Sequence, residues 1–245
     1  RLTLSVIPAF QGDLTAALRV LDDGIAADRL EQFEGLPYRF KVGARAAIFQ
    51  VQGDLAAAAE NIMHASEVEH RRDSTERVYW RDSLAEVWAE MGDFARAESL
   101  ITKLKRETRA VSEVGERAWV SNGAGAVAFW KGDYPTAVRE FEAADSVLNE
   151  VPVALWRARA YIENGQLDKA VALLEERLNN YREWRTFEPI SSVLLHYYLG
   201  IAYEKSGWND KAADEFEKFL GMWHKADPNL APVADARNRL MKLRS

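Results

Sequence analysis

Cysteine is absent from this 245-residue chain, and so are long runs of apolar residues. Without cysteine the chain cannot form a disulfide, use a thiol nucleophile or bind zinc through thiolates. No run approaches the roughly 20 apolar residues that a membrane-spanning helix needs, so we expect no membrane span. A chain without cysteine suits both cytoplasm and periplasm; we expect the cytoplasm, with the periplasm as the alternative.

Positively charged residues are also fewer than negatively charged ones. The chain has 32 Lys and Arg against 38 Asp and Glu, which gives a formal net charge of −6. Phosphate backbones are bound mainly through cations, so this balance argues against nucleic acid as the main partner. The first residue is Arg1 rather than Met, and we expect the chain to be a piece of a longer protein.

What the sequence does contain is a turn that recurs six times. Each copy has a glycine followed five residues later by an alanine, and in five copies an apolar residue stands two positions after the glycine. The glycines are Gly12, Gly53, Gly92, Gly132, Gly165 and Gly207. Their spacing runs from 33 residues (Gly132 to Gly165) to 42 residues (Gly165 to Gly207), which is typical of stacked helical hairpins.

Apolar residues between the turns recur at three- and four-residue spacing, as an amphipathic helix requires. Each unit is therefore predicted as helix, turn, helix: glycine ends the first helix, an Asp after the glycine can cap the second, and the alanine lets the two pack closely. Pro8 predicts a short, kinked or truncated first helix. We expect units at residues 1–30, 38–72, 75–114, 116–149, 152–184 and 189–225, and a capping helix at 232–244.

The units share further residues, and unit six has the fullest set: Leu199, Gly200, Tyr203, Gly207, Ala212 and Phe216. This pattern resembles the tetratricopeptide repeat family over nearly the whole chain. The resemblance implies an all-α fold: a right-handed superhelical α-solenoid of about six helix-turn-helix repeats with a C-terminal capping helix. The longer steps are similar to the helical arms of multidomain bacterial signalling and regulatory proteins.

In that family the first helices line a concave face, and the positions 13, 10, 6, 3 and 2 residues before each turn glycine project into it. The resemblance therefore implies a partner-binding groove formed by Tyr79, Asp82, Glu86, Glu90, Trp119, Asn122, Phe129, Trp130, Arg159, Glu163, Tyr197 and Glu204. This groove is aromatic and apolar, with acidic side chains in unit three. A peptide with apolar anchors and a Lys or Arg would suit it.

Two short patterns have a chemical interpretation and a structural one. Gly123, Gly125 and Ala128 match the dinucleotide-binding spacing G-x-G-x-x-A, but no strand precedes them, which favours close helix packing. Glu60, His64 and Glu67 share one helix face and could together hold a divalent ion. Such faces are common on exposed helices, so we predict no metal and no cofactor.

The sequence thus predicts a non-catalytic protein–protein interaction scaffold that binds a peptide or protein segment in the groove. One alternative is the sensor or regulatory arm of a larger bacterial signalling protein, binding a small ligand or its own catalytic domain. Another is a structural subunit of an assembly. A clamp for a carboxylate chain end is disfavoured, because units two and three carry Gly43, Ala44, Ala47, Asp82, Ser83 and Glu86 where such family members use Lys, Asn and Arg.

Overall fold

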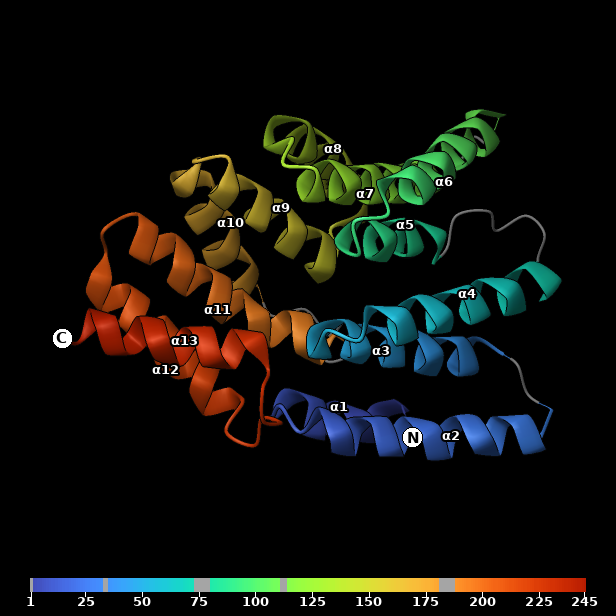
Figure 1. Ribbon diagram of the computed structural model, residues 1–245, viewed down its shortest axis with the longest axis horizontal. Helices are drawn as coiled ribbons and strands as arrows, with labels where there is room; N and C mark the ends of the chain where they lie inside the picture. Colours follow the sequence, from blue (N-terminus) through green and yellow to red (C-terminus); the bar gives the residue numbers. More distant parts are fainter. Residues whose placement is uncertain (1, 33–34, 73–79, 111–113, 181–187) are drawn as a thin grey trace.

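Helical hairpins follow one another through the whole computed structural model, which describes residues 2–32, 35–72, 80–110, 114–180 and 188–245. The helices (Figure 1) are α1 (Leu2–Phe10), α2 (Leu14–Leu30), α3 (Leu36–Gln52), α4 (Leu55–Arg72), α5 (Arg81–Glu90), α6 (Phe94–Glu107), α7 (Val114–Trp130), α8 (Tyr134–Leu148), α9 (Val151–Glu163), α10 (Leu167–Asn179), α11 (Pro189–Lys205), α12 (Asn209–Met222) and α13 (Ala231–Leu243). A short 3-10 turn, Thr108–Ala110, follows α6. These ranges contain no strand, and the predicted all-α solenoid is confirmed.

The six turns have one backbone conformation. All six glycines have φ between +72° and +82°, the left-handed region that glycine enters without steric cost. In the first four turns the aspartate after the glycine accepts a hydrogen bond from the amide three residues on, at 2.8–3.2 Å. That bond satisfies a free amide at the start of the second helix. The last two turns use Gln166 and Trp208 at this position, with no side-chain cap.

Small residues let the helices approach one another closely. The six alanines that follow the turns have no exposed surface: Ala17, Ala58, Ala97, Ala137, Ala170 and Ala212. Within α7, a Cβ at Gly125 would stand 2.8 Å from the ring of Phe141, and a Cβ at Gly123 would stand 2.9 Å from Ile101. The G-x-G-x-x-A spacing is therefore a packing feature in the middle of a helix, as the sequence indicated.

The stack curves until its two ends meet. Figure 1 shows α1 beside the segment that joins α12 to α13, and α1 packs against α11. The amide of Lys225 donates to the carbonyl of Gln11 at 3.0 Å, and the amide of Asp227 donates to that of Gly12 at 3.1 Å. The Asp227 carboxylate also accepts from the amide and the hydroxyl of Thr15, at 2.9 and 3.1 Å. The first turn and the last loop are thus joined by backbone hydrogen bonds.

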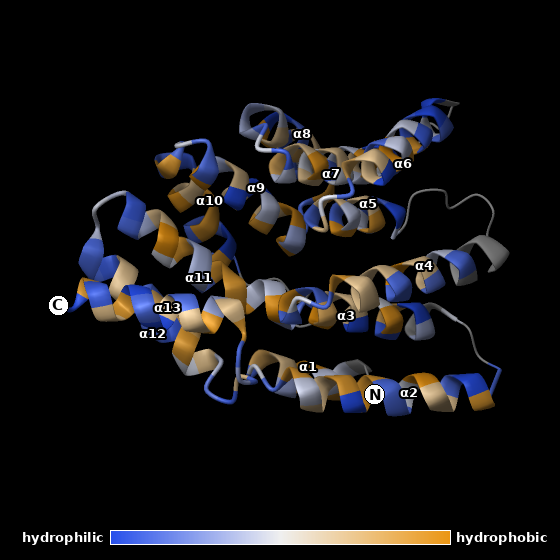
Figure 2. Ribbon diagram, viewed as in Figure 1, coloured by the Kyte–Doolittle hydropathy of each residue, from blue (hydrophilic) through white to orange (hydrophobic). Residues whose placement is uncertain are grey.

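Apolar packing supports this closure. The largest buried cluster joins Leu14 and Leu21 of α2 and Ile48 of α3 to residues of α7–α13, including the fully buried Trp223. Figure 2 shows apolar residues along the helix faces that meet. Since one core runs through both ends of the chain, the repeats form a closed body rather than an open spiral.

The two terminal helices differ in length and role. Helix α1 has nine residues with Pro8 inside it, which agrees with the short first helix that this proline predicted. Helix α13 packs on α12, and its Asp235 accepts a hydrogen bond from the Tyr197 hydroxyl at 2.8 Å. It therefore covers the last hairpin, as expected of a capping helix. In the described part of the chain, no helix has both the length and the hydropathy of a membrane span.

Replacing Gly12 by alanine is expected to destabilise the protein more than replacing Gly53. Both glycines have φ near +80°, so each alanine costs about 1–2 kcal/mol of backbone strain. Only at Gly12 would the new Cβ also collide with another segment, at 2.9 Å from the Ala226 Cα; at Gly53 nothing lies within 4 Å. This overpacking adds about 1–3 kcal/mol.

Urea unfolding of the two variants measures the difference. Hydrogen exchange of the amides of Lys225 and Asp227 shows whether the closure has opened. Equal losses of stability in the two variants, with unchanged exchange at these amides, would contradict a closure that depends on the Gly12 contact.

Candidate functional site

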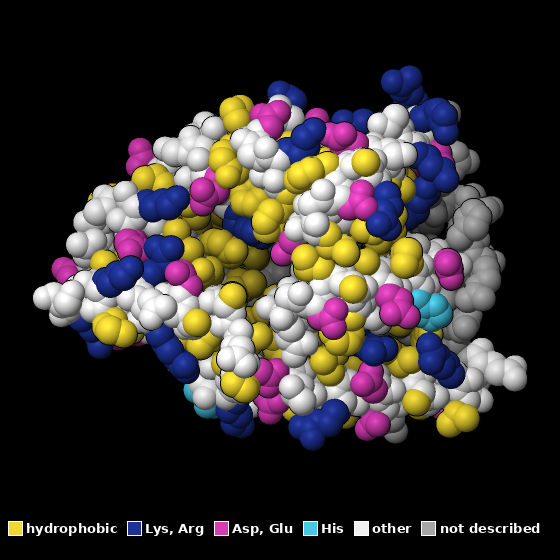
Figure 3. Space-filling model, in the orientation of Figure 1, with side chains coloured by type: hydrophobic (Ala, Val, Ile, Leu, Met, Phe, Trp, Pro, Cys, Tyr) yellow, Lys and Arg dark blue, Asp and Glu magenta, His cyan; other side chains and the backbone are white. Residues whose placement is uncertain are grey.

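A pocket of about 230 Å³ lies between α7, α9 and α11, the first helices of units four to six. Figure 3 shows the molecule hollowed between α9, α11 and α3, with hydrophobic side chains on the walls. The pocket is lined by Phe129, Arg159, Ile162, Glu163, Tyr197, Tyr198 and Ile201. Of the twelve residues predicted from the sequence, the fold brings four together here: Phe129, Arg159, Glu163 and Tyr197.

Arg159 stands among four aromatic rings. The centre of its guanidinium lies 3.8 Å from the ring centroid of Trp156, and 5.0–5.7 Å from those of Phe129, Tyr198 and Trp130. Such contacts attract the cation to the negative face of a ring. Among the described residues, no side chain forms a hydrogen bond or an ion pair with Arg159, although its charge acts on Glu86 and Glu90 at longer range. The pocket therefore contains an unpaired, half-buried positive charge.

The acidic side chains of α5 are satisfied by neighbours within the protein. The Gln50 amide of α3 donates to Glu86 at 2.8 Å and to Glu90 at 2.7 Å. Asp82 accepts from the Asn122 amide at 3.2 Å, and both side chains are buried. Burial raises the pKa of Asp82 and that of Glu86 to about 7, and raises the pKa of Glu90. Asp82 and Asn122 thus lie inside the α5–α7 contact.

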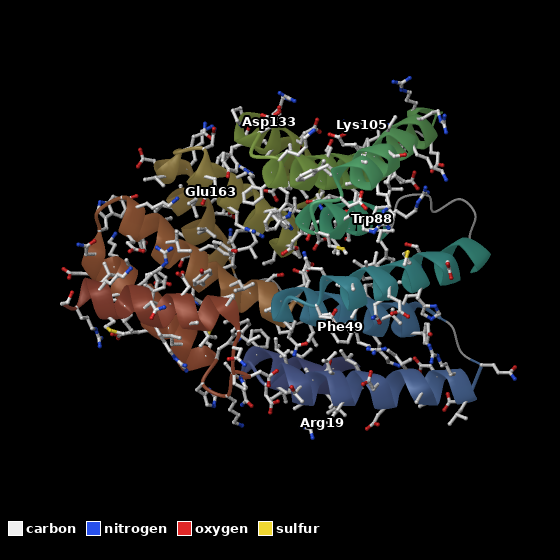
Figure 4. All side chains as sticks on the ribbon, in the orientation of Figure 1. Arg19, Phe49, Trp88, Lys105, Asp133 and Glu163 are labelled. Carbon is white, nitrogen blue, oxygen red and sulfur yellow. The ribbon has the colours of Figure 1, made fainter. Side chains whose placement is uncertain are left out.

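The predicted groove residues whose contacts have not yet been described lie in several different parts of the structure. Trp119 and Trp130 are half-buried against the core between α5 and α7. Glu204 pairs with Arg239 of α13. Glu163 projects from the end of α9 (Figure 4) and pairs with Lys205 at 3.4 Å. Tyr79 lies outside the described residues.

Several residues of this region were absent from the predicted set, among them Gln50, Trp156 and Tyr198. Gln50 stands three residues before Gly53, so the spacing used for the other units would have found it in unit two. Trp156 stands nine residues before Gly165 and fits none of those spacings. It lies beside Arg159 because the two residues are three apart on α9, and the packing of α9 against α7 places the Phe129 ring centroid 5.3 Å from that of Trp156.

A second, larger cavity of about 490 Å³ lies between α8, α9 and α10. Beside it the buried carboxylate of Asp145 accepts hydrogen bonds from Arg157 at 2.7 Å and from Arg177 at 3.0 Å. The Tyr161 hydroxyl donates to Glu142 at 2.6 Å. These charges compensate one another across two repeats, so the network joins unit four to unit five rather than presenting unpaired groups to a ligand.

The histidine considered for metal binding has a structural partner. The Nε2 atom of His64 lies 2.7 Å from the Tyr38 hydroxyl, which links α4 to α3. Glu60 and Glu67 are exposed on the same helix. Within the ranges that the structure covers, no three His, Cys, Asp or Glu side chains are grouped to hold a metal ion.

Stacked helical hairpins define the class of protein, an α-solenoid, and comparisons with known proteins narrow it. Residues 151–176, which span α9 and most of α10, match the family model described as a tetratricopeptide repeat. This match covers one of the six hairpins and, together with the repeated hairpins, supports the resemblance to the tetratricopeptide repeat family. No curated protein sequence matches the chain.

Two solved structures are similar in fold. A tetratricopeptide repeat protein from Parabacteroides merdae ATCC 43184 superposes with a TM-score of 0.56 at 16% identity, covering 100% of this chain and 83% of that one. A chain of the APC/C hetero-tetramer Cut9–Hcn1 gives a TM-score of 0.54 at 16% identity, covering 95% of this chain and 40% of the other. At these identities the likeness concerns the fold alone.

Stability is expected to fall as the pH rises from about 4 to about 7, because Asp82 and Glu86 bind protons more tightly in the folded state than in the unfolded state. Ionising them in place costs about 1–4 kcal/mol per carboxyl, since one pKa unit corresponds to about 1.4 kcal/mol. Asp82→Asn with Glu86→Gln should raise the urea midpoint at pH 8 and flatten its pH dependence. The control is Glu60→Gln, on an exposed residue. An unchanged pH slope in the double variant would refute this account.

Proposed function

We propose that this chain is a non-catalytic protein–protein interaction scaffold that binds a segment of a partner protein on its inner face. The observation that carries the proposal is the pocket between α7, α9 and α11. It gathers four of the residues predicted for partner binding, and one of them, Arg159, carries the unpaired guanidinium. Aromatic and arginine side chains in a partly closed pocket are the residue types that most often anchor a partner.

The size of the pocket favours a side chain over a free small molecule. Sites for drug-sized ligands usually have volumes of about 300–1,000 Å³, whereas this pocket has about 230 Å³. One large side chain would fill it. A sensor arm that binds a small ligand therefore has less support than a scaffold that holds one residue of a longer segment.

The closed stack also supports this function. Repeats that contact their neighbours build an extended inner surface, which such proteins use for binding. Here the first turn is bonded to the last loop, so the inner surface is held in one shape before a partner arrives. A preformed surface lowers the ordering cost of association.

Site-specific photo-crosslinking tests the proposal. A photoreactive p-benzoylphenylalanine at Tyr198, in the pocket, should form adducts with partner proteins in extracts of the source cells. The same group at Arg19, which projects from the outside of α2 (Figure 4) and is exposed, serves as the control. Peptide mapping of the adducts should show one or a few partner segments attached at position 198. Adducts at position 19 with none at 198 would rule out the pocket as the binding site.

A further inference from the structure

The unpaired charge of Arg159 specifies the chemistry of the partner segment. We propose that Arg159 binds the side-chain carboxylate of an aspartate or glutamate on that segment, next to an apolar side chain that fills the pocket. This inference rests on the proposed function and adds the kind of residue that the pocket selects. It reverses the sign of charge expected from the sequence, which favoured a Lys or Arg on the partner.

The first argument is the contrast with other arginines of the structure. Arg157 and Arg177 both pair with Asp145, and Arg239 pairs with Glu204 and Asp235. Arg159 is also half-buried, yet no described side chain accepts a hydrogen bond from it. A guanidinium has five N–H donors in a planar fork that matches both oxygens of a carboxylate. Removing that group from water without a partner is costly, and a bound carboxylate would restore the missing bonds.

The second argument is the orientation of the guanidinium. Trp156 lies 3.8 Å from its centre, and Phe129 and Tyr198 lie within 5.4 Å. Aromatic faces hold a guanidinium through the charge and leave its N–H groups free for an acceptor. Because Arg159 already occupies these rings, they offer no empty cage to a cationic side chain of the partner.

The third argument is the charge around the pocket. Glu86 and Glu90 are hydrogen-bonded to Gln50, and Glu163 is paired with Lys205. Burial raises the pKa of both Glu86 and Glu90, and the charge of Arg159 acts on both in the opposite direction. One unpaired guanidinium near three carboxyl groups suits a singly charged carboxylate, whereas a doubly charged phosphate would be repelled more strongly.

The remaining wall determines what stands beside the carboxylate. Ile162 and Ile201 are apolar, and Tyr197 and Tyr198 add ring surface. A volume of about 230 Å³ holds one Leu, Met or Phe side chain. The expected recognition element is therefore an acidic residue close in sequence to a large apolar residue.

Selection from a phage-displayed library of random dodecapeptides tests the inference. The intact 245-residue chain should enrich peptides in which Asp or Glu lies within a few residues of a large apolar residue. Arg159→Gln should lose this enrichment, and Arg159→Lys should retain part of it, because lysine keeps the charge but not the fork. Arg19→Gln, on the outer face, is the matched control and should behave like the unaltered chain. Circular dichroism melts establish that each variant folds.

Affinities of synthetic peptides give the quantitative test. For an enriched peptide, a Glu→Gln exchange should weaken binding to the unaltered chain at least tenfold and binding to Arg159→Gln by less than threefold. A charge-assisted hydrogen bond pair accounts for a coupling of this size. Enrichment of basic peptides, equal effects in both proteins, or no enrichment would overturn the inference. The photo-crosslinks at position 198 are independent of peptide charge, so they separate failure of this inference from failure of the proposed function.

Discussion

Close contact between paired helices is the constraint on which the structure depends. An alanine five residues after each turn glycine is fully buried in all six hairpins, and Gly125 lies directly against the ring of Phe141. Short distances between helices fix how each hairpin sits on the next. With every hairpin built alike, small rotations accumulate in one direction, and the stack curves far enough for its ends to touch.

Closure gives the first turn a second role. Gly12 ends a helix as the other turn glycines do, but it alone among them has another segment packed against it, at Ala226 and Trp223. Asp227 then binds the start of α2 through Thr15, and Gln52 of the next hairpin donates to the same carboxylate at 3.3 Å. Two repeats at the beginning of the chain are thus hydrogen-bonded to one loop near its end, and the inner face lines a hollow in the closed stack.

Burial also changes the electrostatic character of the inner face. The sequence places three acidic residues on α5, which suggests a negative surface. In the fold, these carboxyl groups accept hydrogen bonds from Asn122 and Gln50. Desolvation favours the protonated forms of Asp82 and Glu86. The charge left without a partner in the pocket is the guanidinium of Arg159. Under the proposed function, a partner would therefore meet the opposite sign of charge from the one that the sequence positions alone suggest.

The sequence by itself determined the helices, the turns and the identity of the packing positions, because these depend on local contacts: a left-handed glycine, an aspartate cap and apolar residues at helical spacing. It also placed Phe129, Arg159, Glu163 and Tyr197 among the twelve residues predicted to line the groove, from a set of offsets before each turn glycine, and these four line one pocket. Only the tertiary structure decided that Gly12 meets Ala226, that Phe129 and Tyr198 flank Arg159, and that Gln50 binds Glu86 and Glu90. These contacts join residues of different repeats, so no single repeat encodes them, and the contact of Gly12 with Ala226 also depends on the curvature summed over the whole stack.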